Sequence, residues 1–133
     1  MKRVVLDASA LMTLFDERPG FEKVEEWIEL AVAREIELSM SVVNWGEVYY
    51  SIWHEYSRSS ADEVARQIKE LPIEIADADL DMTRTAASLR AETRLPYADC
   101  FAAALSILRD ASLATADADF DKVSDRIVLL KLP

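Results

Sequence analysis

Four acidic residues spread along the chain have the types and placement needed for a metal-dependent reaction. Asp7 and Asp117 each directly follow a short apolar run, so we expect them at the carboxyl ends of strands, where α/β proteins bind ligands. Asp99 is the only charged residue in the apolar stretch 97–108, and Glu47 lies early in a mid-chain helical segment. Carboxylates with no histidine or cysteine nearby favour a hard cation, so we predict that Mg²⁺ binds here and that Mn²⁺ substitutes for it. Such clusters hydrolyse phosphodiesters, because bound ions activate water and neutralise phosphate charge.

Each of these residues also has an ordinary structural explanation. Asp7 and Asp117 fit helix or turn caps, and Asp99 fits the first turn of a helix, where a negative charge is favoured. Glu47 fits an exposed helical position, and Gly46 beside it, inside a helix, predicts close backbone packing. The helix of Asp99 is apolar on nearly every face, so its carboxylate should be buried and needs a partner that the helix itself lacks.

Composition limits the fold and the class of protein. The chain has 133 residues, of which 51% are hydrophobic, with only 2 glycines and 4 prolines, so we expect a single domain over residues 1–133. One cysteine excludes an internal disulfide, and no apolar stretch fits a signal peptide or a membrane span, so we expect a cytoplasmic protein without membrane contact. The net charge of −10 excludes binding of nucleic acid by bulk charge, and solubility explains the acidity equally well.

The hydrophobic pattern predicts the elements that must position the acidic residues. We expect strands at residues 3–6, 36–40, 73–76, 112–115 and 127–130, and helices at 21–34, 42–56, 60–71, 80–94 and 96–109. The order is β-α-α-β-α-α-β-α-α-β-turn-β. Such alternation predicts an α/β fold with a parallel sheet and right-handed crossovers.

Four motifs in this order make the chain resemble the PIN-domain ribonucleases, and among them the VapC-type toxins of prokaryotic toxin–antitoxin systems. They are Val-Val-Leu-Asp-Ala-Ser-Ala-Leu at 4–11, Ser-Val-Val-Asn-Trp-Gly-Glu-Val at 41–48, Leu-Pro-Tyr-Ala-Asp at 95–99 and Thr-Ala-Asp-Ala-Asp-Phe at 115–120. The resemblance covers essentially the whole chain. It implies a PIN-like three-layer α/β/α fold, with a five-stranded parallel sheet flanked by helices.

The resemblance also implies roles for particular residues. Asp7 and Asp99 would be the principal ligands of a first Mg²⁺, with Glu47 and Asp117 completing the site. Asp119 matches an acidic position of relatives too, and we prefer Asp117 because it lies nearer the end of its strand. Whether one or two ions bind is left open. Two polar positions that order the site in such proteins are matched by Ser9 and Thr115.

The expected activity is divalent-cation-dependent cleavage of RNA, with the RNA target left open. The resemblance further implies a cognate antitoxin that silences the enzyme. An acidic pocket in an acidic chain suggests that this partner inserts an Arg or Lys among Asp7, Asp99 and Asp117, in competition with the metal. An aromatic stripe in the 42–56 helix predicts a homodimer, because aromatic residues are enriched at interfaces; packing within the chain is the alternative. The stripe comprises Trp45, Tyr49, Trp53 and Tyr56.

Other interpretations fit the sequence less well. Haloacid-dehalogenase-like phosphatases need a second aspartate two residues after the nucleophile, where this chain has Ser9. A receiver-type signalling domain needs paired acids after the first strand and a late lysine, whereas Asp7 stands alone and Lys122 and Lys131 are poorly placed. His54, the only histidine, lies too far along its helix for a general base. A non-catalytic PIN scaffold that binds protein or RNA stays open as the alternative function.

Overall fold

The computed structural model describes residues 1–133 and is built around a five-stranded sheet in which every neighbouring pair of strands is parallel. The order across the sheet is β3-β2-β1-β4-β5. Val4, in the central strand, pairs with Leu38 on one side and with Ser112 on the other. The strands are β1 (Lys2–Leu6), β2 (Ile36–Ser41), β3 (Ile73–Ala76), β4 (Ser112–Thr115) and β5 (Leu129–Lys131).

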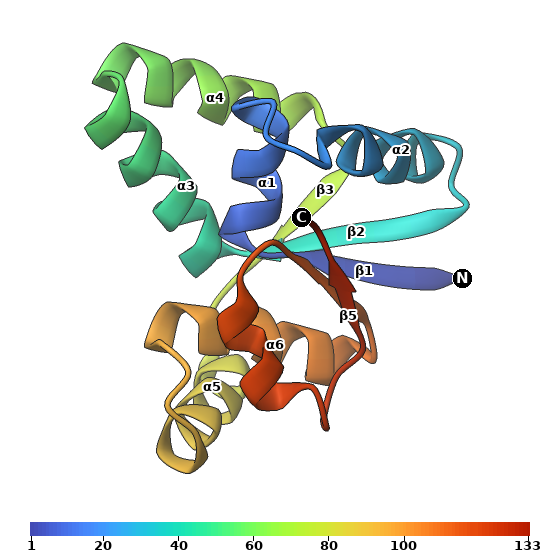
Figure 1. Ribbon diagram of the computed structural model, residues 1–133, viewed down its shortest axis with the longest axis vertical. Coiled ribbons are helices and arrows are strands. Elements are labelled where there is room, and N and C mark those ends of the chain that lie inside the picture. Colours follow the sequence, from blue (N-terminus) through green and yellow to red (C-terminus); the bar gives the residue numbers. More distant parts are fainter.

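Helices cover both faces of this sheet, so the predicted three-layer α/β/α fold is confirmed. One face carries α1 (Ala8–Phe15), α2 (Phe21–Val32), α3 (Val42–Glu55) and α4 (Arg58–Glu70), and the other carries α5 (Leu80–Glu92) and α6 (Tyr97–Arg109) (Figure 1). A short 3₁₀ helix, η1 (Ala118–Val123), follows β4. None of the helices has the length and apolar character that crossing a membrane requires.

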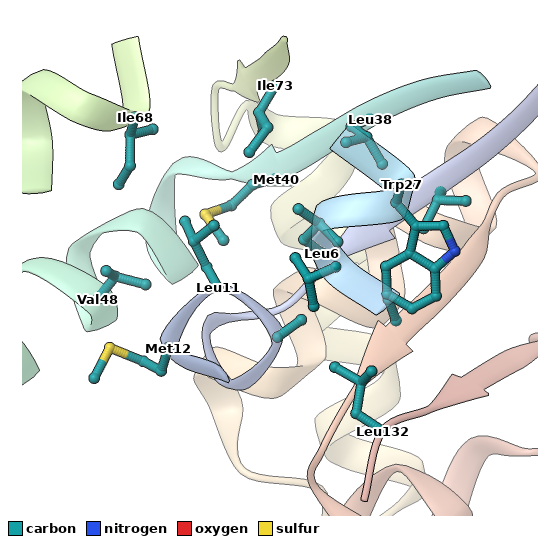
Figure 2. Close-up of a cluster of buried hydrophobic side chains, with 14 of the residues drawn as sticks. Leu6, Leu11, Met12, Trp27, Leu38, Met40, Val48, Ile68, Ile73 and Leu132 are labelled. Atoms are coloured by element: carbon teal, nitrogen blue, oxygen red, sulfur yellow. The ribbon is translucent and has the colours of Figure 1, made fainter. Parts of the chain in front are cut away.

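Two separate hydrophobic clusters fill the spaces between the sheet and its two helical layers. Leu6 of β1 points into the first cluster, together with Leu11 of α1 and Trp27 of α2 (Figure 2). Val4 of β1 belongs to the same cluster. Val5, between them, points into the second cluster under α5 and α6. Because β1 is buried on both faces from Val4 to Leu6, it needs apolar residues at all three of these positions, as buried parallel strands do. Burial of each such side chain contributes about 1.5–3 kcal/mol, so the strand that carries Asp7 is firmly held.

The predicted elements are present, and their ends agree with the structure to within two residues. The last strand begins at Leu129, because Ile127 turns into the second cluster and is 8% exposed. We expected Pro96 in the first turn of the last long helix. It is instead the N-cap of α6, with an extended ψ of 144°, and the helix begins one residue later. The close packing predicted at Gly46 is wrong, because a Cβ there would have no neighbour within 4 Å.

Candidate metal centre

The predicted carboxylates lie at one edge of the sheet because parallel strands end together there. Asp7 follows β1, and Asp117 follows the neighbouring strand β4. Glu47 is in the second turn of α3, which begins directly after β2, and Asp99 is in the first turn of α6. All four line one cavity of about 710 Å³. The sheet therefore brings together side chains from four distant parts of the chain.

Asp7 is a helix cap and a buried site residue at the same time. It is 2% exposed, and its Oδ1 accepts a hydrogen bond of 2.8 Å from the backbone N–H of Ala10, in the first turn of α1. The Ser9 hydroxyl lies 2.8 and 2.9 Å from its two carboxylate oxygens, and Thr115 Oγ1 donates to Oδ2 at 2.6 Å. Burial raises the pKa of Asp7 to about 6, although these hydrogen bonds act in the opposite direction.

Ser9 and Thr115 also tie Asp7 to the end of the neighbouring strand. While Ser9 Oγ donates to Asp7, it accepts a 2.9 Å hydrogen bond from the backbone N–H of Ala116. Thr115 Oγ1 likewise accepts a 2.9 Å bond from the N–H of Asp117. Two hydroxyls thus set the distance between the segments that carry Asp7 and Asp117, which is the ordering role that the resemblance implied for them.

Asp99, Asp117 and Asp119 form the tightest acidic group, with one oxygen from each within 4.8 Å of the others. Two ligands of one Mg²⁺ sit about 2.1 Å from the ion, so their oxygens lie up to about 4.2 Å apart and small side-chain movements complete the fit. An all-oxygen donor set also matches a hard cation. Neither Asp7 nor Glu47 belongs to this group of three, and the question of Asp117 or Asp119 stays open because both do.

The apolar helix around Asp99 predicted a partner for its carboxylate, but the charged groups that raise its pKa are other carboxylates. Burial and the nearby carboxylates together raise the pKa of Asp99 to about 7; burial is the largest cause, followed by the charges of Asp117, Glu47, Asp7 and Asp119, in that order. Asp119 differs from the other four because its side chain is 48% exposed and lies 3.8 Å from Lys122 Nζ. The inner carboxylates therefore lack a protein cation, and their mutual repulsion favours binding of a metal ion.

Asn44 is a site residue that the sequence analysis missed. It is fully buried, and its Nδ2 donates to Glu47 Oε1 at 2.8 Å and to the backbone carbonyl of Ala98 at 3.1 Å. It thereby joins α3 to the start of α6, next to Asp99. Its Oδ1 is buried without a hydrogen-bond partner. Glu47 is accordingly half-buried and held in place, and the exposed-helix explanation for it is wrong. The available signal was a polar residue one turn before Glu47.

Comparison with known proteins identifies the family and the fold. A family model described as PIN domain matches residues 4–126. A crystal structure of VapBC from Salmonella typhimurium, bound to DNA, contains a chain with a TM-score of 0.80 at 17% identity, covering 98% of both chains. A crystal structure of VapBC2 from Rickettsia felis, bound to a promoter DNA fragment, contains a chain with a TM-score of 0.79 at 17% identity. The match covers 98% of this chain and 99% of that chain.

The similarity extends to a further crystal structure. The structure of VapC20 from Mycobacterium tuberculosis, described as a sarcin-ricin-loop-cleaving toxin, gives a TM-score of 0.72 at 12% identity, covering 96% of this chain and 98% of that chain. These identities are low, so the matched structures demonstrate a shared fold. A search among curated proteins gave no significant match.

Proposed function

This chain belongs to the PIN-domain family, and we propose that it is a divalent-cation-dependent endoribonuclease that acts as the toxin of a toxin–antitoxin pair. The observation that carries the proposal is the cavity lined by Asp7, Glu47, Asp99 and Asp117, none of which forms a salt bridge. Like-charged carboxylates that converge without a cation are costly unless they bind one. That cavity lies at the edge of the sheet where α/β proteins place their ligands.

The donor set fits Mg²⁺ or Mn²⁺. We infer that Asp99 and Asp117 hold the ion, with Asp119 close to both of them and with Asp7 and Glu47 lining the same cavity. Asp117 thus takes the place among the principal ligands that the resemblance implied for Asp7. A bound divalent cation supplies neutralisation of phosphate charge and activation of water. Asp7 already accepts hydrogen bonds at both oxygens, so its orientation is set before any ligand arrives. Such preorganisation avoids a reorganisation cost during the reaction.

The remaining chemistry belongs to the protein's own side chains. Glu47 Oε1 is held by Asn44, which leaves Oε2 free to accept a hydrogen bond from the attacking water. That water attacks the phosphorus in line and gives its proton to Glu47, while the P–O bond to the leaving ribose oxygen breaks and that oxygen takes a proton from solvent. Ser9 and Thr115 keep Asp7 and the residue 116–117 turn in register throughout. No side chain need form a covalent bond to the substrate.

The test is cleavage of a panel of structured cellular RNAs by purified protein with Mg²⁺, with Mn²⁺ and with EDTA. We expect cleavage with either ion and none with EDTA. Folded protein that binds RNA but cuts no member of the panel under any of these conditions would overturn the nuclease proposal and favour the non-catalytic scaffold.

We further infer an antitoxin that inhibits by placing an Arg or Lys among Asp7, Asp99 and Asp117. The acidic cavity supports this, and so does the similarity of the fold to a toxin–antitoxin complex from Klebsiella pneumoniae. A guanidinium can bind two carboxylate oxygens at once and exclude the metal.

A small protein encoded beside this one should therefore co-purify with it. Inhibition should weaken when the inserted Arg is changed to Ala, and high Mg²⁺ should partly relieve it. A complex that forms equally well without that Arg and leaves the nuclease active would contradict the model.

The aromatic stripe on α3 also supports a proposed homodimer. Trp45 and Tyr49 stack on each other at 5.4 Å and pack against the first hydrophobic cluster, as the alternative of packing within the chain requires. Trp53 and Tyr56, further along the helix, stay 46% and 57% exposed. Sedimentation at micromolar concentration decides between the homodimer and packing within the chain. We expect a dimer, and a monomer of 15.0 kDa would reject the homodimer.

A further inference from the structure

The cavity is much larger than an ion requires. Its volume of about 710 Å³ falls within the range of small-molecule sites, roughly 300–1,000 Å³. The carboxylates of the candidate metal centre occupy one end. The other end has a more mixed chemistry, with hydroxyl, aromatic, imidazole and guanidinium groups and the one carboxylate of Glu55; it is lined by Arg18, Tyr50, Ser51, His54 and Glu55. The metal proposal leaves this second end unexplained.

One face of α3 connects the two ends. Glu47, Tyr50 and His54 follow one another at helical spacings of three and four residues and all line the cavity. The axial rise of an α-helix places His54 about 10 Å beyond Glu47. The cavity therefore continues past the carboxylates along this helix. A chain molecule that runs along this helix from the carboxylate end passes Tyr50 and His54.

Arg18 also lines the cavity, and it is the one Lys or Arg side chain that does so. Its backbone is fixed by the end of α1. The N–H groups of Glu17 and Arg18 bond to the carbonyls of Leu14 and Thr13, and Glu17 has a φ of 49°. This is the Schellman arrangement, here without the usual glycine. The backbone of Arg18 is therefore held in a defined position by hydrogen bonds to α1.

The guanidinium of Arg18 has most of its donors unused. Nη2 binds Asp16 Oδ2 at 2.8 Å, and the other Asp16 oxygen accepts a 3.0 Å hydrogen bond from Tyr56, which anchors this pair to the end of α3. A guanidinium has five N–H donors, so the remaining ones are available to a ligand. The Arg18 side chain is 46% exposed. An anion that approaches the acidic cavity would find its positive contact here.

We propose that Arg18, Tyr50 and His54 form a subsite for the unpaired nucleotide that flanks the scissile phosphate; this inference rests on the proposed ribonuclease function. The Arg18 guanidinium binds the neighbouring phosphate through paired N–H groups. The Tyr50 ring is 62% exposed and offers a face on which an unstacked base can lie. His54 adds a ring nitrogen one helical turn further on. A base inside a duplex has both faces covered, so this subsite selects unpaired RNA.

The experiment compares cleavage kinetics of one RNA oligonucleotide, single-stranded and annealed to its complement, by the parent and four variants. Arg18→Gln and Tyr50→Ala should each raise KM about tenfold with kcat retained, since stacking and phosphate contacts bind substrate without taking part in bond breaking. Tyr50→Phe keeps the aromatic face and should behave as the parent. Arg66→Gln is the matched control, because Arg66 also pairs with a nearby carboxylate, Glu63, but lies on α4 outside the cavity.

A second readout measures binding without turnover. Fluorescence anisotropy of a labelled oligonucleotide on Asp99→Asn protein should show about tenfold weaker binding when Arg18→Gln or Tyr50→Ala is added. A parent that cuts no RNA overturns the proposed function and this subsite with it. A parent that cuts RNA while both variants keep its KM and affinity overturns the subsite alone. Variants that cut RNA normally but escape the antitoxin would assign this end of the cavity to the protein partner and also reject the proposal.

Discussion

The two ends of the parallel sheet carry their charges in opposite ways. At the amino end, Arg3 Nε lies 3.3 Å from Glu37 Oε2, and Arg109 donates two hydrogen bonds, of 2.9 and 2.6 Å, to Glu74. Both ends are hollowed, with a cavity of about 410 Å³ beside these pairs. At the carboxyl end the carboxylates of the candidate metal centre face one another, and the four inner ones have no basic partner within salt-bridge distance.

The pKa shifts at the two ends have opposite signs for this reason. The Arg109 guanidinium lowers the pKa of Glu74, whereas burial and neighbouring carboxylates raise the pKa of Asp99 to about 7. Exposed ion pairs of the first kind contribute about 0–1 kcal/mol and need no further ligand. Buried like charges of the second kind destabilise the metal-free protein. Carboxylates that converge without basic partners, and not charge alone, therefore mark the functional end of the sheet.

The largest expected effect is on catalysis at the carboxyl end. Asp7→Asn and Asp99→Asn should each reduce RNA cleavage in Mg²⁺ by orders of magnitude while the far-ultraviolet circular dichroism stays that of the parent, because each removes a charge from the metal centre. Arg109→Ala, at the amino end, is the control; it should keep the parental rate and change stability by no more than about 1 kcal/mol. If both Asn variants cut as fast as the parent, the two ends do not differ in the way described.

The second effect is on stability without metal. Below a pH of about 4 Asp99 is protonated in both states, whereas between 3.8 and about 7 only the folded protein holds the proton. Stability should therefore fall as pH rises through this window, and Asp99→Asn should flatten that fall. In EDTA at neutral pH the variant should melt at a higher temperature than the parent, and Mg²⁺ should stabilise the parent more. Melting curves across pH in EDTA measure this, and an equal or lower melting temperature for the variant would count against close clustering.

The third effect concerns how Glu47 is held. Asn44→Ala removes the donor to Glu47 Oε1 and to the Ala98 carbonyl, so we expect activity to fall about 10–100-fold, as for other groups that support metal ligands. The concentration of Mn²⁺ needed for half-maximal cleavage should rise as well. Loss of the unpartnered Oδ1 offsets part of the stability cost. Unchanged activity and Mn²⁺ dependence would show that Glu47 needs no positioning.

The smallest effect comes from Gly46, beside Glu47 on the same helix. Gly46→Ala should stabilise the protein by about 1 kcal/mol, because alanine favours the helix and its methyl group meets no atom within 4 Å. Cleavage should be unaffected, since nothing shifts around Glu47. Urea unfolding measures the change. A destabilised variant would instead support the close backbone packing that the sequence predicted at Gly46.

Much of this architecture could be predicted because its signals are local in the chain. The β-branched run before Asp7 and the turn after Thr115 place two carboxylates at strand ends without knowledge of the sheet order. The apolar helix around Asp99 suggested a buried carboxylate, and the structure makes it half-buried. The end of the last strand was harder to place, because Ile127 is apolar whether it extends the strand or turns into the core, and only tertiary packing decides between the two.

The residues that the sequence did not reveal depend on contacts between distant segments. Asn44 matters because α6 passes close enough for the Ala98 carbonyl to accept its hydrogen bond. Arg18 reaches the cavity because Glu17 takes a left-handed backbone conformation that non-glycine residues rarely adopt. The open space at Gly46 likewise follows from where neighbouring helices lie. Composition and periodicity carry no information about such distances.

Direct measurement of Mn²⁺ binding tests the central claim, that the unpaired carboxylates at the carboxyl end form a metal centre. Electron paramagnetic resonance of the metal-free protein titrated with Mn²⁺ reports the bound ion without any RNA. We expect saturable binding to the parent and to Arg109→Ala, competition by Mg²⁺, and affinity weakened by more than about tenfold in Asp99→Asn and Asp117→Asn. Equal Mn²⁺ affinity in the parent and both Asn variants would contradict the account.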